Sequence, residues 1–348
     1  MISFKSVKGL AALTVVALSA TLVLSGPVKA DTPALVIYDA IGYDQDIAKA
    51  FTAATGIKVN IVTDSTGPLL AKAAAEQNNP QWDLFWADGD TWAAAMDLQG
   101  KLLPYAPKAH FTNVGAQLTP KNHSYNISGV TAMVGAVYNA DKIKNIPANF
   151  AAMLKPEFKG LIGMNDPSIS GPTYPFVAGL MNQLGGEDAG KAFLSKMKDN
   201  GLVINDKNGP TLHALEIGQI QIGLVQSSAA MNEVAKFTAK PVAGFTPKIF
   251  YPARTTLLPS SIAIDKNRPA ASQAAAKKFI DFLFSPAGQA IATQTANSDS
   301  FFWSVIRGTT LNPAVTPFPT RYQIIDPYKW GPLQGEIDTW FTSSIRGK

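Results

Sequence analysis

The 348-residue sequence contains no cysteine, which excludes disulfide bonds, thiolate catalysis and cysteine-ligated metals. Its few histidines, His110, His123 and His213, are scattered and lack the spacing of a zinc site. The G-x-S-x-G and H-E-x-x-H motifs are missing too. Because the residues offer no coherent set of nucleophile, base and orienting group, we expect a protein that is not an enzyme and needs no cofactor or metal.

Long apolar runs are missing as well, except for one near the N-terminus. Two lysines precede an apolar run over residues 10–24, and the small-residue site Val28-Lys29-Ala30 follows it. This order is typical of a secretory signal peptide, which we predict over residues 1–30. No later stretch approaches the roughly 20 apolar residues that span a bilayer. We therefore expect a mature protein that is periplasmic and not embedded in the membrane.

Basic and acidic side chains are nearly balanced once the predicted signal peptide, here called the leader, is excluded. The whole chain has 30 basic and 25 acidic side chains, and the leader holds three lysines and no acid, which leaves 27 against 25, or a net charge of +2. That charge is too weak for a nucleic-acid footprint, so we expect no nucleic-acid partner. Asp31 stands where a lipoprotein would have cysteine. We therefore expect a free monomer in a Gram-negative periplasm.

The mature chain alternates between strand and helix patterns. Residues 34–39 form an apolar run typical of a buried strand, and residues 44–55 place apolar side chains at helical spacing before Gly56. A strand over 57–63, a helix over 69–77, a strand over 82–86 and a helix over 91–99 are expected next. This order predicts an α/β fold in which helices cover both faces of a mostly parallel sheet.

Two β-type stretches predict crossings between two lobes. Residues 127–138 are long enough to pass from one lobe to the other, and residues 249–258 provide the return crossing. The strand and helix alternation repeats between them, which predicts a second α/β lobe. We assign residues 31–132 and 255–348 to the first lobe, with the tail from Asn312 wrapping it, and residues 133–254 to the second lobe.

Small polar residues follow several predicted strands directly before helices. They are Ser65, Thr66 and Gly67; Ser168, Ser170, Gly171 and Thr173 in the loop before Tyr174; Thr211 in the segment Asn208-Gly209-Pro210-Thr211; and Ser227 in Gln226-Ser227-Ser228. Backbone N–H groups at helix starts and the helix dipole favour anions. If these segments converge at the carboxyl ends of the strands, they predict an anion site in the crevice there. Ordinary helix capping is the alternative.

Two acidic residues at strand ends of the first lobe and two tyrosines are further candidates for the site. Asp39 and Asp88 are placed to accept hydrogen bonds from a ligand ammonium or hydroxyl group. Alternatively, Asp88 and its neighbour Asp90 cap the helix that follows. Tyr43 and Tyr251 are candidates for the walls of the site, with burial in the core as the alternative.

Five stretches carry a resemblance to a known family. They are the strand-helix opening from Val36 to Gly56, the stretch from Trp82 to Tyr105, DPSISG at 166–171, GGEDAGKAFL at 185–194 and KKFIDFLFSPAGQ at 277–289. Together they resemble the extracellular solute-binding proteins of ABC importers, in the cluster of ferric-iron, 2-aminoethylphosphonate, hexose-phosphate and thiamine binders. The resemblance implies a two-lobed, type II-like periplasmic binding fold. Each lobe is then a mixed, mostly parallel sheet flanked by helices, and two crossing segments form the hinge.

The same resemblance implies an inner-membrane ABC permease as partner and a small ligand captured by hinge closure. Ferric binders of the cluster commonly use two neighbouring tyrosines in the second half of the chain, whereas Tyr251 here follows Phe250 and no Tyr-Tyr pair occurs. We therefore expect a phosphonate or phosphate-ester ligand, with a zwitterion included in that class. Ferric iron is the alternative within the family, and a secreted phosphate-ester hydrolase is the alternative of another class.

Overall fold

The computed structural model describes residues 33–295 and 298–347. From residue 32 to the C-terminus the chain forms one compact unit. The predicted signal peptide lies outside the described residues. Within the described ranges, no helix combines the length and the apolar character needed to cross a membrane.

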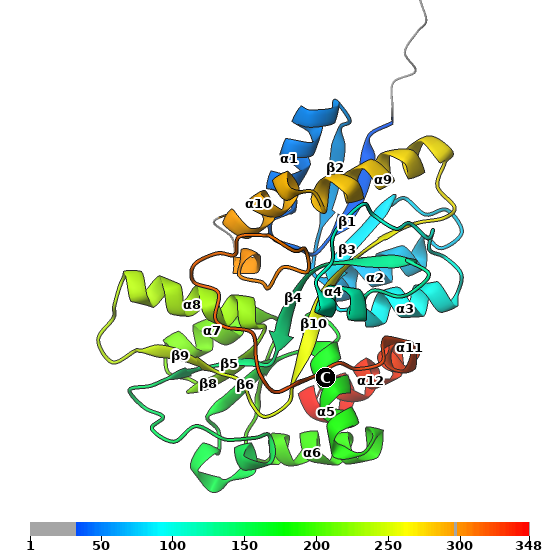
Figure 1. Ribbon diagram of the computed structural model, residues 1–348. Coiled ribbons are helices and arrows are strands. Elements are labelled where there is room, and N and C mark those ends of the chain that lie inside the picture. Colours follow the sequence, from blue (N-terminus) through cyan, green and yellow to red (C-terminus); the bar gives the residue numbers. More distant parts are fainter. Residues whose placement is uncertain (1–32, 296–297, 348) are drawn as a thin grey trace, which may run out of the picture. The chain divides into compact units, whose positions relative to one another are not determined.

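The first sheet has the strand order β11-β10-β3-β1-β2, and β4 pairs with β10 (Figure 1). The central strand β1 pairs in parallel with β2 and β3, whereas β10 runs antiparallel to β3 and β4. The strands are β1 Leu35–Asp39, β2 Val59–Thr63, β3 Leu84–Asp88, β4 Tyr125–Met133, β10 Thr255–Ile264 and β11 Tyr322–Gln323. We call this sheet and the helices packed on it the first lobe.

The helices of the first lobe include those that the sequence predicts over residues 44–55, 69–77 and 91–99. They are α1 Asp44–Thr55, α2 Thr66–Ala75, α3 Thr91–Leu98, α4 Asn113–Leu118, α9 Ala270–Leu283, α10 Pro286–Gln294 and the short turn η3 Ser298–Ser300. In α1, two acidic residues occupy the first turn, where they complement the helix dipole, and Gly56 ends the helix with a φ of 74°. Phe51 from its buried face packs edge-on against Phe279 of α9, with ring centroids 5.1 Å apart. This contact joins the first and the ninth helix over the sheet.

The second sheet has the strand order β7-β6-β8-β5-β9. Its strands are β5 Gly135–Asn139, β6 Ile162–Asn165, β7 Val203–Asn205, β8 Ile222–Val225 and β9 Pro247–Phe250. β6 pairs in parallel with β7 and β8, and β5 runs antiparallel to β8 and β9. We call this sheet and its helices the second lobe.

The helices of the second lobe follow the strand ends, as in the first lobe. They are the turns η1 Ala151–Leu154 and η2 Pro156–Phe158, and the helices α5 Thr173–Leu184, α6 Glu187–Asp199, α7 Asn208–Glu216 and α8 Ser227–Ala239. The helices α5, α7 and α8 begin after the loops that follow β6, β7 and β8, respectively. Their first residues therefore lie at the carboxyl edge of the sheet, where ligands of such folds bind.

The chain passes from one sheet to the other at two places. β4 of the first sheet is followed by β5 of the second after Val134 alone, and the return runs from β9 to β10. Two sheets flanked by helices and joined by a pair of crossings confirm the predicted mixed α/β class. The strands β1, β2 and β3 of the first sheet and β6, β7 and β8 of the second pair in parallel, and the strands β5 and β10 next to the crossings supply the antiparallel pairs.

The C-terminal tail differs in part from the expectation that it wraps the first lobe. It forms α11 Pro327–Trp330, η4 Gly331–Leu333, α12 Gln334–Trp340 and the π-helical turn η5 Phe341–Arg346. α11 and η4 pack against α3 of the first lobe. However, Ile337, Phe341 and Ile345 are buried in the hydrophobic core of the second lobe. The tail therefore contacts both lobes, because its apolar side chains complete the second core (Figure 1).

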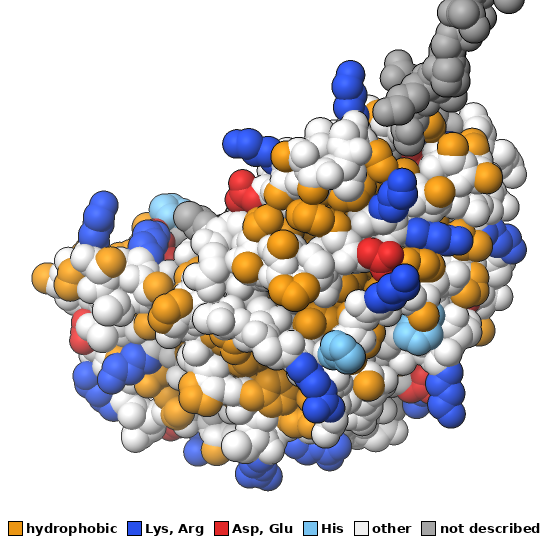
Figure 2. Space-filling view, turned by 45° about the horizontal axis from the view of Figure 1, so that its top comes forward, with side chains coloured by type: hydrophobic (Ala, Val, Ile, Leu, Met, Phe, Trp, Pro, Cys, Tyr) orange, Lys and Arg blue, Asp and Glu red, His pale blue; other side chains and the backbone are white. Residues whose placement is uncertain are grey.

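One face of the molecule shows how charged side chains are distributed over it. On the face shown in Figure 2, Lys and Arg side chains stand out singly over both lobes, with apolar and uncharged polar atoms between them. The few acidic side chains visible there are also scattered.

Candidate functional site: a polar cavity between helix starts

A polar cavity of about 200 Å³ lies where the two lobes meet. Ala40, Ser65, Thr66, Asp88 and Asp299 line it from the first lobe, and Ser170, Gly171, Pro172, Lys207, Asn208, Gly209 and Gln226 line it from the second. Contributions from both lobes mean that a ligand in this cavity contacts both at once. We call it the polar cavity.

Four helices begin at the polar cavity. The residues directly before α2, α5, α7 and α8 are Ser65, Pro172, Lys207 and Gln226, and all four line it. None of the four accepts a side-chain hydrogen bond from its own helix. Helix dipoles place partial positive charge at such starts, so their convergence favours a bound anion. Three of these helices belong to the second lobe, so the favourable potential for an anion is concentrated on that side.

Lys207 adds a full positive charge to these dipoles. Among the described residues that line the polar cavity, it is the only lysine or arginine. Its Nζ donates to the Ser65 Oγ at 3.4 Å, across the junction between the lobes. An ammonium group with donors to spare at this point suits a phosphate or phosphonate oxygen.

Two carboxyl groups face the cavity from the first lobe. Asp88, at the end of β3, accepts a hydrogen bond of 2.7 Å from the Ser260 hydroxyl. Burial, reinforced by the nearby Asp299, raises the pKa of Asp88 to about 7. Asp299 accepts a 2.9 Å hydrogen bond from the Gly42 N–H, and burial also raises its pKa. A ligand cation beside these two carboxyl groups would favour their charged forms, so this wall is suited to an ammonium group.

A wider space of about 600 Å³ adjoins the polar cavity and shares Ala40, Ser65, Lys207 and Asp299 with it. Its other walls include Asp44 and Asp64, which extend the acidic character of the first-lobe side. The two spaces together are therefore electrically asymmetric, with three of the four helix starts and Lys207 on the second-lobe side and the carboxyl groups on the first-lobe side.

Five of the predicted site residues line the polar cavity: Ser65, Thr66, Asp88, Ser170 and Gly171. Gly67 and Ser168 lie next to it but face a different space. Their segments touch each other, since the Gly67 N–H donates to the Ile169 carbonyl at 3.5 Å. These two positions form a contact between the lobes.

Three predicted hydroxyl donors, Thr173, Thr211 and Ser227, do not line the polar cavity. Thr173 is fully buried. The Thr211 hydroxyl donates to the Asn165 side-chain oxygen at 2.7 Å, and the Ser227 hydroxyl accepts from the Ala132 N–H at 2.9 Å. These three hydroxyl groups therefore lie outside the polar cavity, although their loops contribute other residues to its walls.

Asp39, Tyr43 and Tyr251 also lie outside the lining. Asp39 is fully buried under the cavity and accepts a hydrogen bond from the Ile41 N–H at 2.8 Å. Tyr43 stacks on Phe302 with ring centroids 5.5 Å apart, which is the core role weighed as its alternative. The Tyr251 hydroxyl pairs with that of Thr316 at 2.8 Å.

Lys207, Asn208, Gln226 and Asp299 line the cavity but were not selected from the sequence. Asn208 and Gln226 stand in loops that were recognised, at the positions where a helix starts and its N–H groups are open. A lysine next to an Asn-Gly-Pro helix start was an available signal for Lys207. No sequence signal indicated Asp299, because its position depends on a long-range contact, the hydrogen bond that it accepts from the Gly42 N–H.

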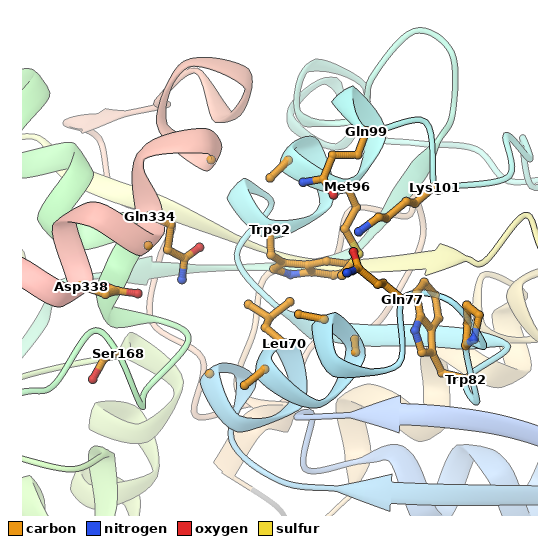
Figure 3. A pocket seen from close by; sticks show the side chains of 18 of the residues that line it. Leu70, Gln77, Trp82, Trp92, Met96, Gln99, Lys101, Ser168, Gln334 and Asp338 are labelled. Carbon is orange, nitrogen blue, oxygen red and sulfur yellow. The ribbon is translucent and has the colours of Figure 1, made fainter.

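A second cavity, of about 520 Å³, lies between α2, α3 and the C-terminal helices (Figure 3). Its walls are largely apolar and include Leu70, Trp82, Trp92 and Met96. In Figure 3, Gln334 extends from the C-terminal helix toward the Trp92 side of this space. Few charges face it, so an anion would lose hydration there with little compensation.

The fold and its cavity together define a two-lobed protein with a small polar cavity between the lobes. Comparison with known proteins agrees with this class. Residues 46–315 match the family described as bacterial extracellular solute-binding protein, and the chain belongs to that family. The predicted family is thereby confirmed.

Curated relatives of the chain carry a more specific name. A periplasmic protein of Salmonella paratyphi A, whose name attributes 2-aminoethylphosphonate binding to it, is 28% identical over 247 residues, which cover 69% of this chain and 68% of the relative. The corresponding protein of Salmonella typhimurium is also 28% identical over 247 residues, with the same coverage.

Solved structures share the fold at low sequence identity. The periplasmic binding protein AfuA from Actinobacillus pleuropneumoniae, solved with fructose-6-phosphate, has a TM-score of 0.77 and 21% identity, covering 90% of this chain and 99% of AfuA. The periplasmic binding protein P5PA has a TM-score of 0.75 and 21% identity, over 89% and 99% of the two chains. Iron-bound HitA from Pseudomonas aeruginosa has a TM-score of 0.73 and 20% identity, over 88% and 99%. At these identities the likeness establishes the two-lobed fold.

Proposed function

We propose that this protein is the periplasmic substrate-binding component of an ABC importer and that it captures a small zwitterionic phosphonate of the 2-aminoethylphosphonate type. One observation carries the proposal: the polar cavity has Lys207 and three helix starts on its second-lobe side, and Asp88 and Asp299 on its first-lobe side. A ligand with an anionic group at one end and an ammonium at the other complements both sides.

The size of the polar cavity supports a very small ligand. Sites for drug-sized molecules occupy about 300 to 1,000 Å³, and this cavity of about 200 Å³ is below that range. A short aminoalkyl phosphonate fills such a space, while a hexose phosphate would also need the adjoining space. The names of the Salmonella relatives support the same ligand class.

Capture follows from contacts that a ligand makes with both lobes. In the proposed mechanism, the phosphonate binds the helix starts of the second lobe, and the ammonium then adds contacts to the first lobe. The ligand thus has a higher affinity for the arrangement in which the lobes touch, and this difference shifts the hinge equilibrium. The closed form is what the permease would recognise.

A thermal-shift panel followed by calorimetry tests the proposal. The panel contains 2-aminoethylphosphonate, methylphosphonate, inorganic phosphate, fructose 6-phosphate, thiamine, spermidine and ferric citrate. A ligand at 100 times its Kd stabilises the folded protein by about 2.7 kcal/mol, which is readily measured as a rise in Tm. We expect the largest rise with 2-aminoethylphosphonate and a smaller one with methylphosphonate, which lacks the amine.

Other outcomes would replace the proposal with a different function. Stabilisation by ferric citrate alone would indicate an iron binder, although no tyrosine is among the described residues that line the polar cavity. Release of inorganic phosphate from phosphate esters at catalytic rates would indicate a hydrolase. Stabilisation by spermidine but by no anion would mean that the carboxyl groups, and not the helix starts, select the ligand.

A further inference from the structure

Arg346, close to the C-terminus, makes ion pairs with two acidic residues at once. Its Nη1 donates to the Asp166 Oδ2, and its Nη2 donates to the Asp206 Oδ1 at 2.5 Å. The Arg346 side chain is 13% exposed and that of Asp166 is 1% exposed, whereas Asp206 is 53% exposed. The guanidinium group therefore bridges a buried and a surface carboxylate.

The two carboxylates belong to the loops that lead into α5 and α7. Asp166 follows β6, and its Oδ1 accepts hydrogen bonds from the Ser168 N–H at 2.9 Å and from the Ser168 hydroxyl at 2.6 Å. Asp206 directly precedes Lys207. The backbones of the two loops are also joined, since the Asp166 N–H donates to the Asn205 carbonyl at 2.8 Å. Arg346, which does not line the polar cavity itself, thus connects the two loops that place Ser170 and Lys207 there.

Arg346 is itself held in place by the packing of the C-terminal turn. Phe341 and Ile345 of η5 are buried in the core of the second lobe. Lys198 of α6 donates to the Ser344 carbonyl at 2.7 Å, which attaches the turn to a second helix without touching either loop. The guanidinium group is therefore presented to the loops from a fixed element.

We propose that Arg346 is a positioning residue for the anion site: it fixes the loops before α5 and α7 and offsets one of the two negative charges of Asp166 and Asp206 near the bound anion. This inference rests on the proposed function, because it assumes that the polar cavity takes an anion. Without the guanidinium group, two carboxylates would face each other at the back of the loops. Their repulsion would separate the loops and their negative charge would oppose the anion.

Four variants separate the parts of the proposal. Arg346→Gln removes the charge, and Arg346→Lys keeps it on a group that cannot form the same fork. Arg346→Gln combined with Asp206→Asn removes the positive charge together with one of the two negative charges. Lys198→Met is the matched control, since it weakens the attachment of the same C-terminal turn and leaves both ion pairs in place. Circular dichroism and the Tm of each ligand-free variant verify folding.

Calorimetry with 2-aminoethylphosphonate gives the first readout. We expect Arg346→Gln to weaken binding about tenfold or more, Arg346→Lys to weaken it less, and Lys198→Met to change it by less than about twofold. The double variant should recover the part of the affinity that was lost through charge, which a purely structural role would not produce. Wild-type affinity in Arg346→Gln, an equal loss in Lys198→Met, or no recovery in the double variant would overturn the proposal.

Hydrogen exchange of the ligand-free proteins gives the second readout and does not depend on the ligand. We expect faster exchange over residues 166–171 and 206–210 in Arg346→Gln, with Lys198→Met like the wild type there. Unchanged exchange in both segments would overturn the positioning role. If the wild type does not bind 2-aminoethylphosphonate, the proposed function fails, and the exchange result still decides whether Arg346 fixes the loops.

Discussion

Replacing Gly67 by alanine tests the contact between the start of α2 and the loop after β6. A Cβ atom at Gly67 would lie 2.1 Å from the Ser168 carbonyl oxygen and 3.0 Å from its carbon. Carbon and oxygen atoms that are not bonded normally approach no closer than about 3.2 Å, so the two segments would have to separate by about 1 Å. Both partners are backbone, and neither can move aside by rotating a side chain.

The cost of this separation falls on the arrangement in which the lobes touch. Overpacking at a close contact costs about 1 to 3 kcal/mol. If the whole penalty opposes closure, ligand affinity falls by about 5- to 150-fold. The unfolding free energy of the ligand-free protein should change little, because the lobes are able to separate and alanine favours a helix by about 0.5 to 1 kcal/mol over glycine.

Calorimetry with the ligand that stabilises the wild type, together with chemical denaturation of the ligand-free protein, measures both quantities. Gly335→Ala in α12 is the matched control, because a Cβ atom there would meet nothing within 4 Å. We expect weaker binding in Gly67→Ala and unchanged binding in Gly335→Ala. Equal affinity in both variants would refute the reasoning that the Gly67 contact forms part of the ligand-bound state.

Three further predictions concern charge, pH and the core. Lys207→Met should lower phosphonate affinity about tenfold and flatten its dependence on salt, as titrations at two ionic strengths would reveal; an unchanged salt dependence would contradict an ionic contact. Burial raises the pKa of Asp88 to about 7 in the folded protein, so its proton binds more tightly there than in the unfolded chain, and unfolding free energy should fall as the pH rises from about 4 to about 7. Asp88→Asn should therefore stabilise the ligand-free protein more at pH 8 than at pH 5, and similar gains at both values would contradict this. Phe279→Ala removes a fully buried ring that packs against Phe51 and should cost about 3 to 5 kcal/mol in urea unfolding; a loss below about 1 kcal/mol would mean that the joint between α1 and α9 contributes little.

Local patterns were sufficient to predict many of the elements. The helix expected over residues 44–55 is α1 with the same limits, because apolar spacing, acidic residues in the first turn and Gly56 all act within the segment. The helix expected over residues 69–77 instead starts at Thr66. Its first turn packs against the Ser168 loop of the other lobe, and this contact lies beyond any local window.

The sequence indicated the loops that line the polar cavity better than the individual lining residues. Strand-end position and helix starts depend on chain order, so the segments around Ser65, Ser170 and Asn208 were found. Which side chain of each segment faces the cavity depends on the rotation of each helix against its sheet. Thr211, one turn into α7, therefore points to Asn165 of β6, whereas Lys207 points to Ser65 of the other lobe.

The C-terminal tail shows the same limit. Its apolar residues Ile337, Phe341 and Ile345 mark a helix that must be buried, but periodicity does not say against which lobe. In the structure this apolar face packs in the core of the second lobe, and Arg346 contacts the loops that contain Asp166 and Asp206. The contact of the tail with these loops was therefore not predictable from the sequence pattern.

A crystal structure of the complex with 2-aminoethylphosphonate is the most direct test of the central claim. The account predicts the phosphonate at the starts of α5 and α7 beside Lys207, with the amine next to Asp88. A phosphonate placed against Asp88 and Asp299, or a ligand seated in the apolar cavity beside Trp92, would contradict it.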